Sequence, residues 1–248
     1  MNVTAKLSDR HQNLVRRSVA TLVAVPLIGV GVAFFRMAML GMDTFQVMMG
    51  GIDAVFPGVP FGLLWFVSLA VMLIIPFVFK RSLIGPGTIL NIVIVGYIID
   101  HAYHLLHQAI PNHYLGLRIL WLGIGVLIIA MAIAFYLTAN VGISAYDGIT
   151  IIVAERHPKL AFKYWRIICD CICLLLGVLL FLAAGKPPQE LFGLLGVGTI
   201  VAALGMGPLI AWFAEKIARP ALYPQPGFTS STSESQPPEI PAAQNPGR

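Results

Sequence analysis

Charged residues are scarce in this chain, and that scarcity excludes most classes of soluble protein. Asp, Glu, Lys and Arg together make up 11% of the 248 residues, whereas hydrophobic residues make up 58%. The mean hydropathy is +0.84. A water-soluble single domain of this size carries more charge on its surface, so the composition indicates an integral membrane protein.

Acidic residues are scarcer than basic ones, with 11 Asp and Glu against 16 Lys and Arg and a formal net charge of +5. A basic balance can indicate nucleic-acid binding. Here, however, the basic residues stand at the ends of apolar stretches and form no patch interleaved with aromatic residues. We therefore expect no nucleic-acid partner, and membrane topology explains the charge.

Cysteine is rare as well, and its three copies stand in one apolar stretch, at Cys169, Cys171 and Cys173. Residues two apart on a helix point about 200° from each other, so these thiols cannot converge on one ion. We interpret them as packing residues. They give no argument for a disulfide, and we expect no cofactor.

Long apolar stretches dominate the rest of the sequence. A bilayer core of about 30 Å needs about 20 apolar residues in a helix that rises about 1.5 Å per residue. An open sheet edge cannot be satisfied in lipid, and the alternating segments of a barrel are absent, so we predict helices. The six predicted spans are residues 18–39, 61–79, 84–106, 118–139, 164–184 and 191–213.

Two blocks of the first half recur in the same order in the second half. One block pairs Gly41 with Gly142 at an offset of 101 residues, and the other is a Gly-x-Gly-Thr-Ile segment at an offset of 111. Internal repetition of this kind indicates two copies of one structural unit. The aligned blocks are residues 31–46 with 132–147, and residues 85–89 with 196–200.

Each copy contains three spans, so the second copy enters the membrane from the opposite side. We predict an all-α membrane protein with six transmembrane helices as two inverted three-helix repeats, an architecture of many secondary transporters. A short interfacial or re-entrant helix follows the first span of each repeat. The predicted divisions are a cytoplasmic N-terminal segment at 1–17, the first repeat at 18–110, the second repeat at 111–219, which completes one membrane domain, and a disordered cytoplasmic tail at 220–248.

The positions of Lys and Arg predict the orientation. A cytoplasmic N-terminus leaves only Arg36, Arg118 and Lys186 outside and puts twelve of the Lys and Arg residues inside, which predicts that both termini are cytoplasmic. The pair Arg16-Arg17 resembles a twin-arginine export signal, but no small-residue cleavage site follows it. We therefore expect a retained first helix.

A polar interruption follows the first helix of each repeat. It contains Asp43 and Gln46 in the first repeat, and Ser144 and Asp147 at the aligned positions of the second. The start of a helix has about four free N–H groups and a partial positive charge. Two interpretations stay open: these residues are N-caps of interface helices, or they contact a substrate or ion, with Asp43 and Asp147 coupling protons or cations.

Two charged residues lie within predicted spans. Arg36 is near the end of the first span, and an unpaired Arg at the bilayer centre costs about 3 kcal/mol. It therefore either snorkels to the interface or points at an acidic partner such as Asp43 or Asp100. Asp170 follows Arg166 by one turn inside an apolar run, so it is either half of a structural i to i+4 ion pair or a functional carboxylate.

The densest polar cluster is at the end of the third predicted span. Asp100, His104 and His107 fall within about 60° on a helical wheel, and His113 follows in the loop. A carboxylate and imidazoles on one face suit a divalent metal or a proton relay. Against a metal site, there is no HExxH pattern, and the second repeat has only Glu215 at the place of His104.

With these motifs, the chain resembles the YczE/YitT-like family of bacterial inner-membrane proteins over about residues 15 to 219. The resemblance rests on the segments around Gly41 and Gly142 and on the two Gly-Thr-Ile helices. In that family a Gly-Pro-x-Ile-Asp pattern is common; here the first copy has no Pro and the second has no acid. The resemblance implies a multi-pass location in the bacterial inner (cytoplasmic) membrane and no particular substrate.

The leading hypothesis is a small secondary transporter or permease of unknown substrate, and not an enzyme, with its site between the two repeats. The alternatives are a non-transporting membrane scaffold for a partner complex, and a metal-dependent membrane enzyme that uses the Asp100 cluster. The expected partners are the lipid bilayer, an unknown small solute or ion, and a second copy of the chain that covers small-residue surfaces. The candidate transport residues are Asp43, Gln46, Ser144, Asp147, Arg36 and Asp170.

Overall fold

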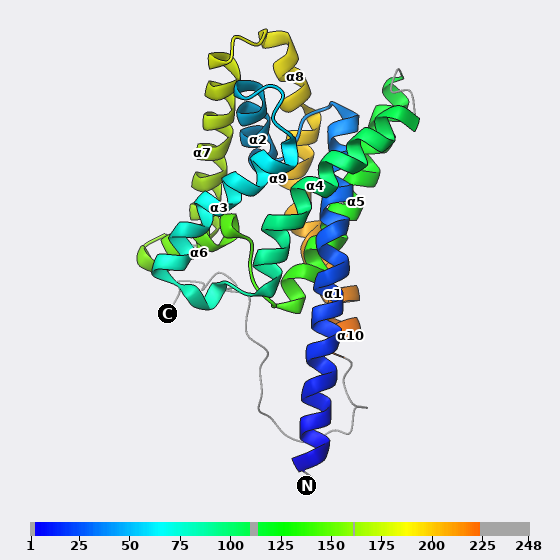
Figure 1. Cartoon of the computed structure of the whole chain (residues 1–248), viewed down its shortest axis with the longest axis vertical. Helices are drawn as coiled ribbons and strands as arrows, with labels where there is room; N and C mark the ends of the chain where they lie inside the picture. Colours follow the sequence, from blue (N-terminus) through cyan, green and yellow to red (C-terminus); the bar gives the residue numbers. More distant parts are fainter. Residues whose placement is uncertain (1–2, 110–113, 161, 224–248) are drawn as a thin grey trace.

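The computed structural model describes residues 3–109, 114–160 and 162–223, and over these residues it is helical and contains no strand. The helices and their arrangement are drawn in Figure 1. The helices are α1 (Val3–Ala38), α2 (Thr44–Val55), α3 (Phe61–Phe79), α4 (Pro86–Ala109), α5 (Leu115–Ala139), α6 (Ala145–Arg156), α7 (Phe162–Ala183), α8 (Leu191–Leu194), α9 (Val197–Phe213) and α10 (Arg219–Leu222), with 3-10 turns at Arg81–Leu83 and Pro188–Glu190 and a π turn at Ala214–Ala218.

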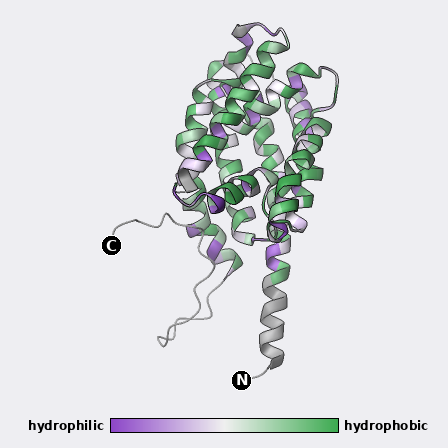
Figure 2. Ribbon diagram, turned by 90° about the vertical axis from the view of Figure 1, so that its left-hand side faces the viewer, coloured by the Kyte–Doolittle hydropathy of each residue, from purple (hydrophilic) through white to green (hydrophobic). Residues whose placement is uncertain are grey.

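In the part of the chain that the structure describes, six helical segments are long and apolar enough to cross a membrane, as the sequence predicts. Most of their residues are hydrophobic (Figure 2), and many of the large hydrophobic side chains are exposed. Such a surface suits lipid contact and confirms the class of multi-pass membrane protein. The six segments are Leu14–Ala38, Phe61–Phe79, Pro86–Ala109, Leu115–Ala139, Tyr164–Ala183 and Val197–Leu222.

The helix boundaries differ most from the prediction at the two ends of the chain. The helix α1 begins at Val3, so it includes most of the segment expected to precede the first span. The last span begins at Val197, because Gly196 is extended and separates α9 from the short helix α8. The predicted disordered tail begins at residue 220, but helix α10 continues to Leu222; the rest of the predicted tail, from residue 224, lies outside the described residues.

Helices α1 and α5 lie side by side in opposite directions along one side of the bundle (Figure 1). Small residues permit this close approach. A Cβ atom on Gly31 would lie 2.5 Å from Cγ1 of Ile129, and one on Gly125 would lie 3.1 Å from the carbonyl oxygen of Gly31. Such backbone contact is how helices associate in lipid, where the hydrophobic effect between them is weak.

An arginine from each of these two helices binds the end of the other. Nε of Arg17 donates to the carbonyl of Ala139 at 2.5 Å, and its Nη2 donates to Asn140 at 2.6 Å. Nε of Arg118 donates to the carbonyl of Ala38 at 2.7 Å, and its Nη2 donates to Met39. These carbonyls are the unpaired acceptors of a helix C-terminus, so each guanidinium caps a helix of the other half.

The short helices α2 and α6 each pack against a long helix that is distant in the sequence. Helix α2 lies along α7, where a Cβ atom on Gly51 would meet the carbonyl oxygen of Gly177 at 2.3 Å. Helix α6 lies against α3, where a Cβ atom on Gly148 would lie 3.0 Å from Pro76. Each short helix thus packs on a spanning helix from the other half of the sequence.

Candidate functional site

The junction that follows α1, residues 39–43, contains one residue in a left-handed backbone conformation that only glycine adopts easily. Gly41 has φ +104°, and a Cβ atom there would lie 2.5 Å from the backbone nitrogen of Gly196. The amide of Met42 donates to the carbonyl of Leu194 at 2.9 Å, and the amide of Gly198 donates to Leu40 at 2.7 Å. The loop is therefore fixed against the start of α9.

The junction after α5 repeats this arrangement at the aligned residues. Gly142 has φ +132°, and a Cβ atom there would lie 2.7 Å from Oγ1 of Thr88. The amide of Ile143 donates to the carbonyl of Leu83 at 3.1 Å. The amide of Gly87 donates to the carbonyl of Val141 at 3.0 Å. The Gly-Thr-Ile segments are thus docking sites for the two junctions.

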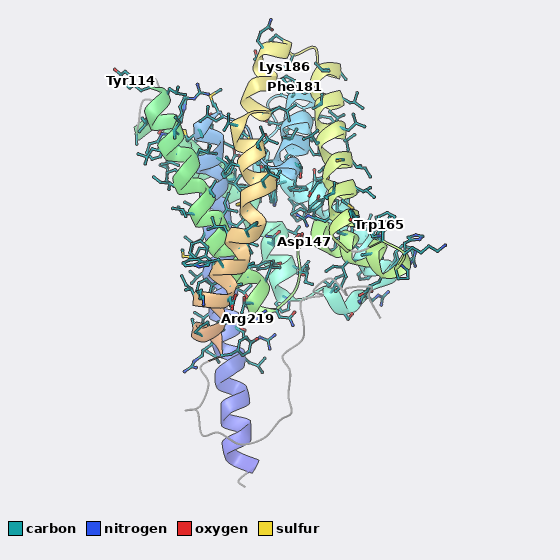
Figure 3. All side chains as sticks on the ribbon, turned by 180° about the vertical axis from the view of Figure 1, so that it is seen from behind. Tyr114, Asp147, Trp165, Phe181, Lys186 and Arg219 are labelled. Carbon is teal, nitrogen blue, oxygen red and sulfur yellow. The ribbon has the colours of Figure 1, made fainter. Side chains whose placement is uncertain are left out.

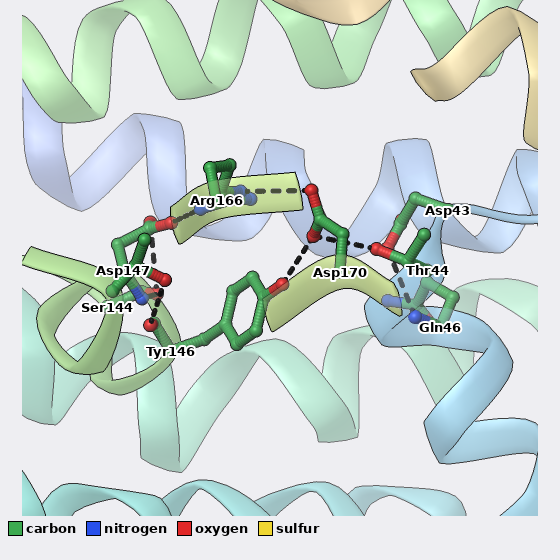
Figure 4. Close-up of polar contacts among 9 residues, drawn as sticks. Asp43, Thr44, Gln46, Ser144, Tyr146, Asp147, Arg166 and Asp170 are labelled. Carbon is green, nitrogen blue, oxygen red and sulfur yellow. Dashed lines mark hydrogen bonds and ion pairs between the residues drawn. The ribbon is translucent and has the colours of Figure 1, made fainter. Parts of the chain in front are cut away.

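Each junction ends in an N-cap, as one of the two interpretations expects. Oδ1 of Asp43 accepts a hydrogen bond of 3.0 Å from the amide of Gln46. Oγ of Ser144 accepts one of 3.2 Å from the amide of Asp147 and also donates to Oδ2 of that residue at 3.1 Å. The caps orient the first turns of α2 and α6 toward helix α7 (Figure 4).

Five side chains from these two turns and from α7 form a connected group, which we call the α7 network (Figure 4). Arg166 forms an ion pair with Asp147, and its Nε lies 3.4 Å from Oδ2 of Asp170. Oδ1 of Asp170 accepts hydrogen bonds from the hydroxyl of Tyr146 and, at 2.9 Å, from Oγ1 of Thr44. One cation is thus held between two carboxylates.

The α7 network is only partly covered. The side chains of Arg166, Asp147 and Asp170 are 38%, 30% and 28% exposed. The guanidinium of Arg166 also lies over the ring of Tyr146, with 4.6 Å from its carbon to the ring centroid. The protein itself therefore leaves part of the surface of all three charged side chains uncovered.

Asp43, beside the network, and Tyr146, within it, have pKa values above their ordinary ranges. Burial raises the pKa of Asp43, and the charge of Asp170 raises it further, while the amide of Gln46 and the charge of Arg166 oppose the shift. Burial also raises the pKa of Tyr146, so its hydroxyl keeps the proton that it donates to Asp170. Asp43 therefore takes up a proton more readily than an ordinary carboxyl group.

Most of the predicted transport residues meet at this site. Asp147 and Asp170 belong to the network, Ser144 caps the helix that presents it, and Asp43 and Gln46 belong to the adjacent first turn of α2. The predicted i to i+4 pair of Arg166 and Asp170 is confirmed.

Three contributions to the network were not predicted from the sequence. They are the pairing of Arg166 with Asp147 and the hydroxyl groups of Thr44 and Tyr146. One signal was present in the alignment of the two repeats. Tyr146 stands where the first repeat has Phe45, so a hydroxyl replaces a hydrogen at a position that is otherwise apolar and buried.

Arg36 lies in a different cluster. Its Nη2 is 3.6 Å from Oδ2 of Asp53, which corrects the expectation of Asp43 or Asp100 as its partner. Its guanidinium lies over the ring of Phe61 at 4.1 Å and over the ring of Tyr103 at 4.9 Å. Both stacking contacts hold the charge in place at the end of the bundle where α4 ends.

The residues considered for a metal site share that end of the bundle. Nε2 of His104 is 4.0 Å from Oδ1 of Asp100, and the ring of His107 stacks on Tyr103 at 5.7 Å. Among residues 3–109, 114–160 and 162–223, no group of three or more His, Cys, Asp or Glu side chains is placed to hold a metal ion. His113 lies outside these residues, and the metal hypothesis stays a prediction.

The comparisons with known proteins give a family and no activity. A family model described as "Family of unknown function (DUF6198)" matches residues 15–215. An uncharacterized protein of Haemophilus influenzae is 28% identical over 199 residues, which cover 80% of this chain and 83% of that protein. No solved structure matches the chain. The description of the family does not confirm the YczE/YitT-like resemblance.

Proposed function

Because the chain belongs to DUF6198, a family of unknown function, its activity has to be argued from its own residues, and we propose that it is a small proton-coupled secondary transporter with the α7 network as its ion site. The expected lipid, solute and second-copy partners stay proposals. So does a distant relationship to the YczE/YitT-like family.

One observation carries the proposal: an arginine and two aspartates form a charged group on a spanning helix, and a hydroxyl from the other half of the sequence, Thr44, donates to it. Arg166 and Asp170 lie inside the span Tyr164–Ala183. Ionised residues at membrane depth are costly, and they are retained mostly where they serve substrate or ion pathways. A purely structural bundle would be more stable with apolar residues of similar volume at these positions.

Matched contacts support two inverted repeats around this site. Arg17 and Arg118 are 101 residues apart, and each caps the helix of the other at aligned carbonyls. The two junctions dock on the Gly-Thr-Ile segments through two backbone hydrogen bonds each, also at aligned positions. Two units of the same fold in opposite orientations would make such reciprocal contacts.

The same architecture indicates how access to the site would alternate. Thr44 belongs to the first half and Asp170 to the second, so their hydrogen bond joins the halves within the network. Protonation of Asp170 would convert a charge-assisted bond into a weaker neutral one and would free Arg166 to pair with Asp147 alone. We infer that this proton releases α2 from α7 and lets one three-helix unit rock against the other.

The charges at the ends of the bundle support the proposed orientation in a bacterial inner membrane. Arg219 lies at the end of the bundle from which α1 enters, whereas Lys186 and Tyr114 lie at the opposite end (Figure 3). The excess of basic residues at the first end favours the cytoplasm for that end. Both termini would then be cytoplasmic.

Thiol labelling tests alternating access without knowledge of the solute. In a background with Cys169, Cys171 and Cys173 changed to Ala, a Thr44→Cys variant should react with a membrane-impermeant maleimide added to either side of sealed vesicles. Ala24→Cys, in the buried face of α1, is the matched control and should stay unlabelled. Reaction of Thr44→Cys from one side only, or from neither, would contradict alternating access and favour a scaffold.

Flux measurement tests the coupling. Vesicles with an internal pH indicator are exposed to a panel of small solutes, and a solute-dependent pH change identifies transport. The variant Asp170→Asn should abolish that change, and so should the triple variant with Asp43→Asn and Asp147→Asn added, whereas Glu190→Gln, an exposed acid away from the network, should keep it. Full flux in the Asp170→Asn variant would remove the proposed proton site.

A further inference from the structure

A cavity at the far end of the bundle from the α7 network has its own polar lining. It has a volume of about 330 Å³ and lies where α1, α2 and α4 end and α3 begins. The α7 network does not line it. The charged and aromatic side chains in its lining are Arg36, Asp53, Phe61, Asp100, Tyr103 and His104.

The guanidinium in this cavity is held in a fixed position and has an unsatisfied donor. Arg36 lies over the rings of Phe61 and Tyr103, and its Nη2 faces Asp53 at 3.6 Å. Its Nη1 is buried and has no acceptor among the described residues. A buried donor of this kind costs about 1–3 kcal/mol. The Arg36 side chain as a whole is 17% exposed and lines the cavity, so an entering carboxylate would meet the part of it that faces the cavity.

The opposite charge in the same cavity comes from two carboxylates. Asp53 and Asp100 both line it, and Asp100 is 4.0 Å from the neighbouring His104. Burial and the charge of Asp100 raise the pKa of Asp53, so the two acids repel each other. A bound ammonium group would remove that repulsion.

A ligand with one charge fits this lining poorly. An anion would face two carboxylates, and a cation would face the guanidinium of Arg36. A zwitterion satisfies both sets at once, if its carboxylate lies toward Arg36 and its amine lies toward Asp53 and Asp100. A cavity of about 330 Å³ is at the small end of ligand pockets, which suits a molecule the size of an amino acid.

We propose that this cavity is a binding site for a small α-amino acid. The Arg36 side chain is preorganised by its two aromatic neighbours, so little of its conformational entropy is lost on binding. The claim is independent of the transport proposal, because it concerns binding alone.

Thermal unfolding of the purified full chain in detergent tests the proposal. Each of the twenty common amino acids is added singly, and acetate and methylammonium supply the two halves of the ligand at the same ionic strength. At least one amino acid should raise the Tm in a saturable way, and its apparent Kd should be at least about tenfold lower than that of either half.

Variants assign the effect to the cavity. Arg36→Gln and Asp100→Asn should each raise the apparent Kd at least about tenfold, whereas Glu190→Gln should leave it unchanged. If Arg36→Gln does not fold, Arg36→Lys replaces it, because Lys keeps the charge but loses the planar fork. Arg36→Lys and Asp100→Asn should then both bind the amino acid more weakly than the parent. Stabilisation by no amino acid, equal stabilisation by acetate or methylammonium, or full binding in Asp100→Asn would overturn the proposal.

Discussion

The junctions after α1 and α5 have the same backbone and different side chains. Both place a left-handed glycine against a Gly-Thr-Ile segment, and both begin a short helix with a side-chain cap. The first junction has Asp43 and Phe45 where the second has Ser144 and Tyr146. Only the second also supplies an ion-pair partner, Asp147, to α7.

The difference separates two kinds of constraint on the same structure. The backbone contacts fix how the two halves dock, so they need glycine and matching hydrogen bonds in both copies. The side chains face one network on one helix, and a single network needs only one Tyr and one ion-pair partner. The two copies therefore diverge where they meet α7 and agree where they meet each other.

The largest expected effect comes from Gly41→Ala and Gly142→Ala. Each change adds about 1–2 kcal/mol for a left-handed residue with a Cβ atom and about 1–3 kcal/mol for overpacking against the opposite backbone. Both variants should lose most of their folded yield in detergent, as measured by size-exclusion chromatography.

Gly58→Ala is the matched control for the glycine variants. Gly58 has φ +91°, but a Cβ atom there meets nothing within 4 Å. It should show the cost of the backbone angle alone. Gly41→Ala or Gly142→Ala with the stability of Gly58→Ala would mean that docking of the junctions does not depend on close contact.

A smaller effect is expected from the two capping arginines. Arg17→Gln and Arg118→Gln each remove charge-assisted bonds to two helix-terminal carbonyls, for about 1–3 kcal/mol each. Thermal unfolding should show similar losses for the two variants and little change for Arg16→Gln, which is exposed. A loss at one arginine and none at the other would break the equivalence of the two halves.

The sequence alone predicted the helices and much of the site because both leave local signals. Six apolar stretches are long enough to span a bilayer, and all six are helices of the expected length class. The aligned polar pairs that begin with Asp43 and Ser144 marked both caps. The repeats therefore reveal local structure that recurs, without showing what each copy contacts.

The rest depended on contacts between residues far apart in the sequence. Thr44 and Asp170 are brought together by packing of α2 on α7, which glycines at positions 51 and 177 permit. Arg36 has an acidic partner, but it is Asp53, on the far side of a loop that no local pattern specifies. Side-chain partners of this kind follow from tertiary packing and not from periodicity.

The two caps should also differ in their response to pH. Because burial raises the pKa of Asp43, the folded state keeps a proton that the unfolded chain has released. The stability contributed by Asp43 is therefore complete below the unfolded pKa of about 4 and decreases as the pH rises through the folded pKa. Ser144 does not titrate, so its cap gives no such slope.

Asp43→Asn isolates this effect, because Asn keeps the cap and cannot ionise. Thermal unfolding between pH 4 and pH 8 should show the variant gaining stability relative to the parent as the pH rises. Ser144→Ala should lose about 1 kcal/mol at every pH in that range. A constant difference between Asp43→Asn and the parent would contradict the raised pKa.

The smallest expected effects concern the hydroxyls that converge on Asp170, and they test whether the network joins the two halves. Thr44→Val removes the bond from the first half, and Tyr146→Phe gives the second junction the side chain of the first. Each should lower the free energy of unfolding by about 1 kcal/mol, because Asp170 is partly exposed and keeps its ion pair with Arg166.

Since both hydroxyls donate to Oδ1 of Asp170, the two losses should not add, and the double variant should deviate from their sum by about 0.5 kcal/mol or more. Thr199→Val is the control, because it removes a hydroxyl in the Gly-Thr-Ile segment of α9, away from Asp170. Its loss of stability should add to that of Thr44→Val or Tyr146→Phe within about 0.3 kcal/mol. Strict additivity of Thr44→Val and Tyr146→Phe would mean that the two junctions act on α7 separately, and a common proton on Asp170 could not then coordinate them.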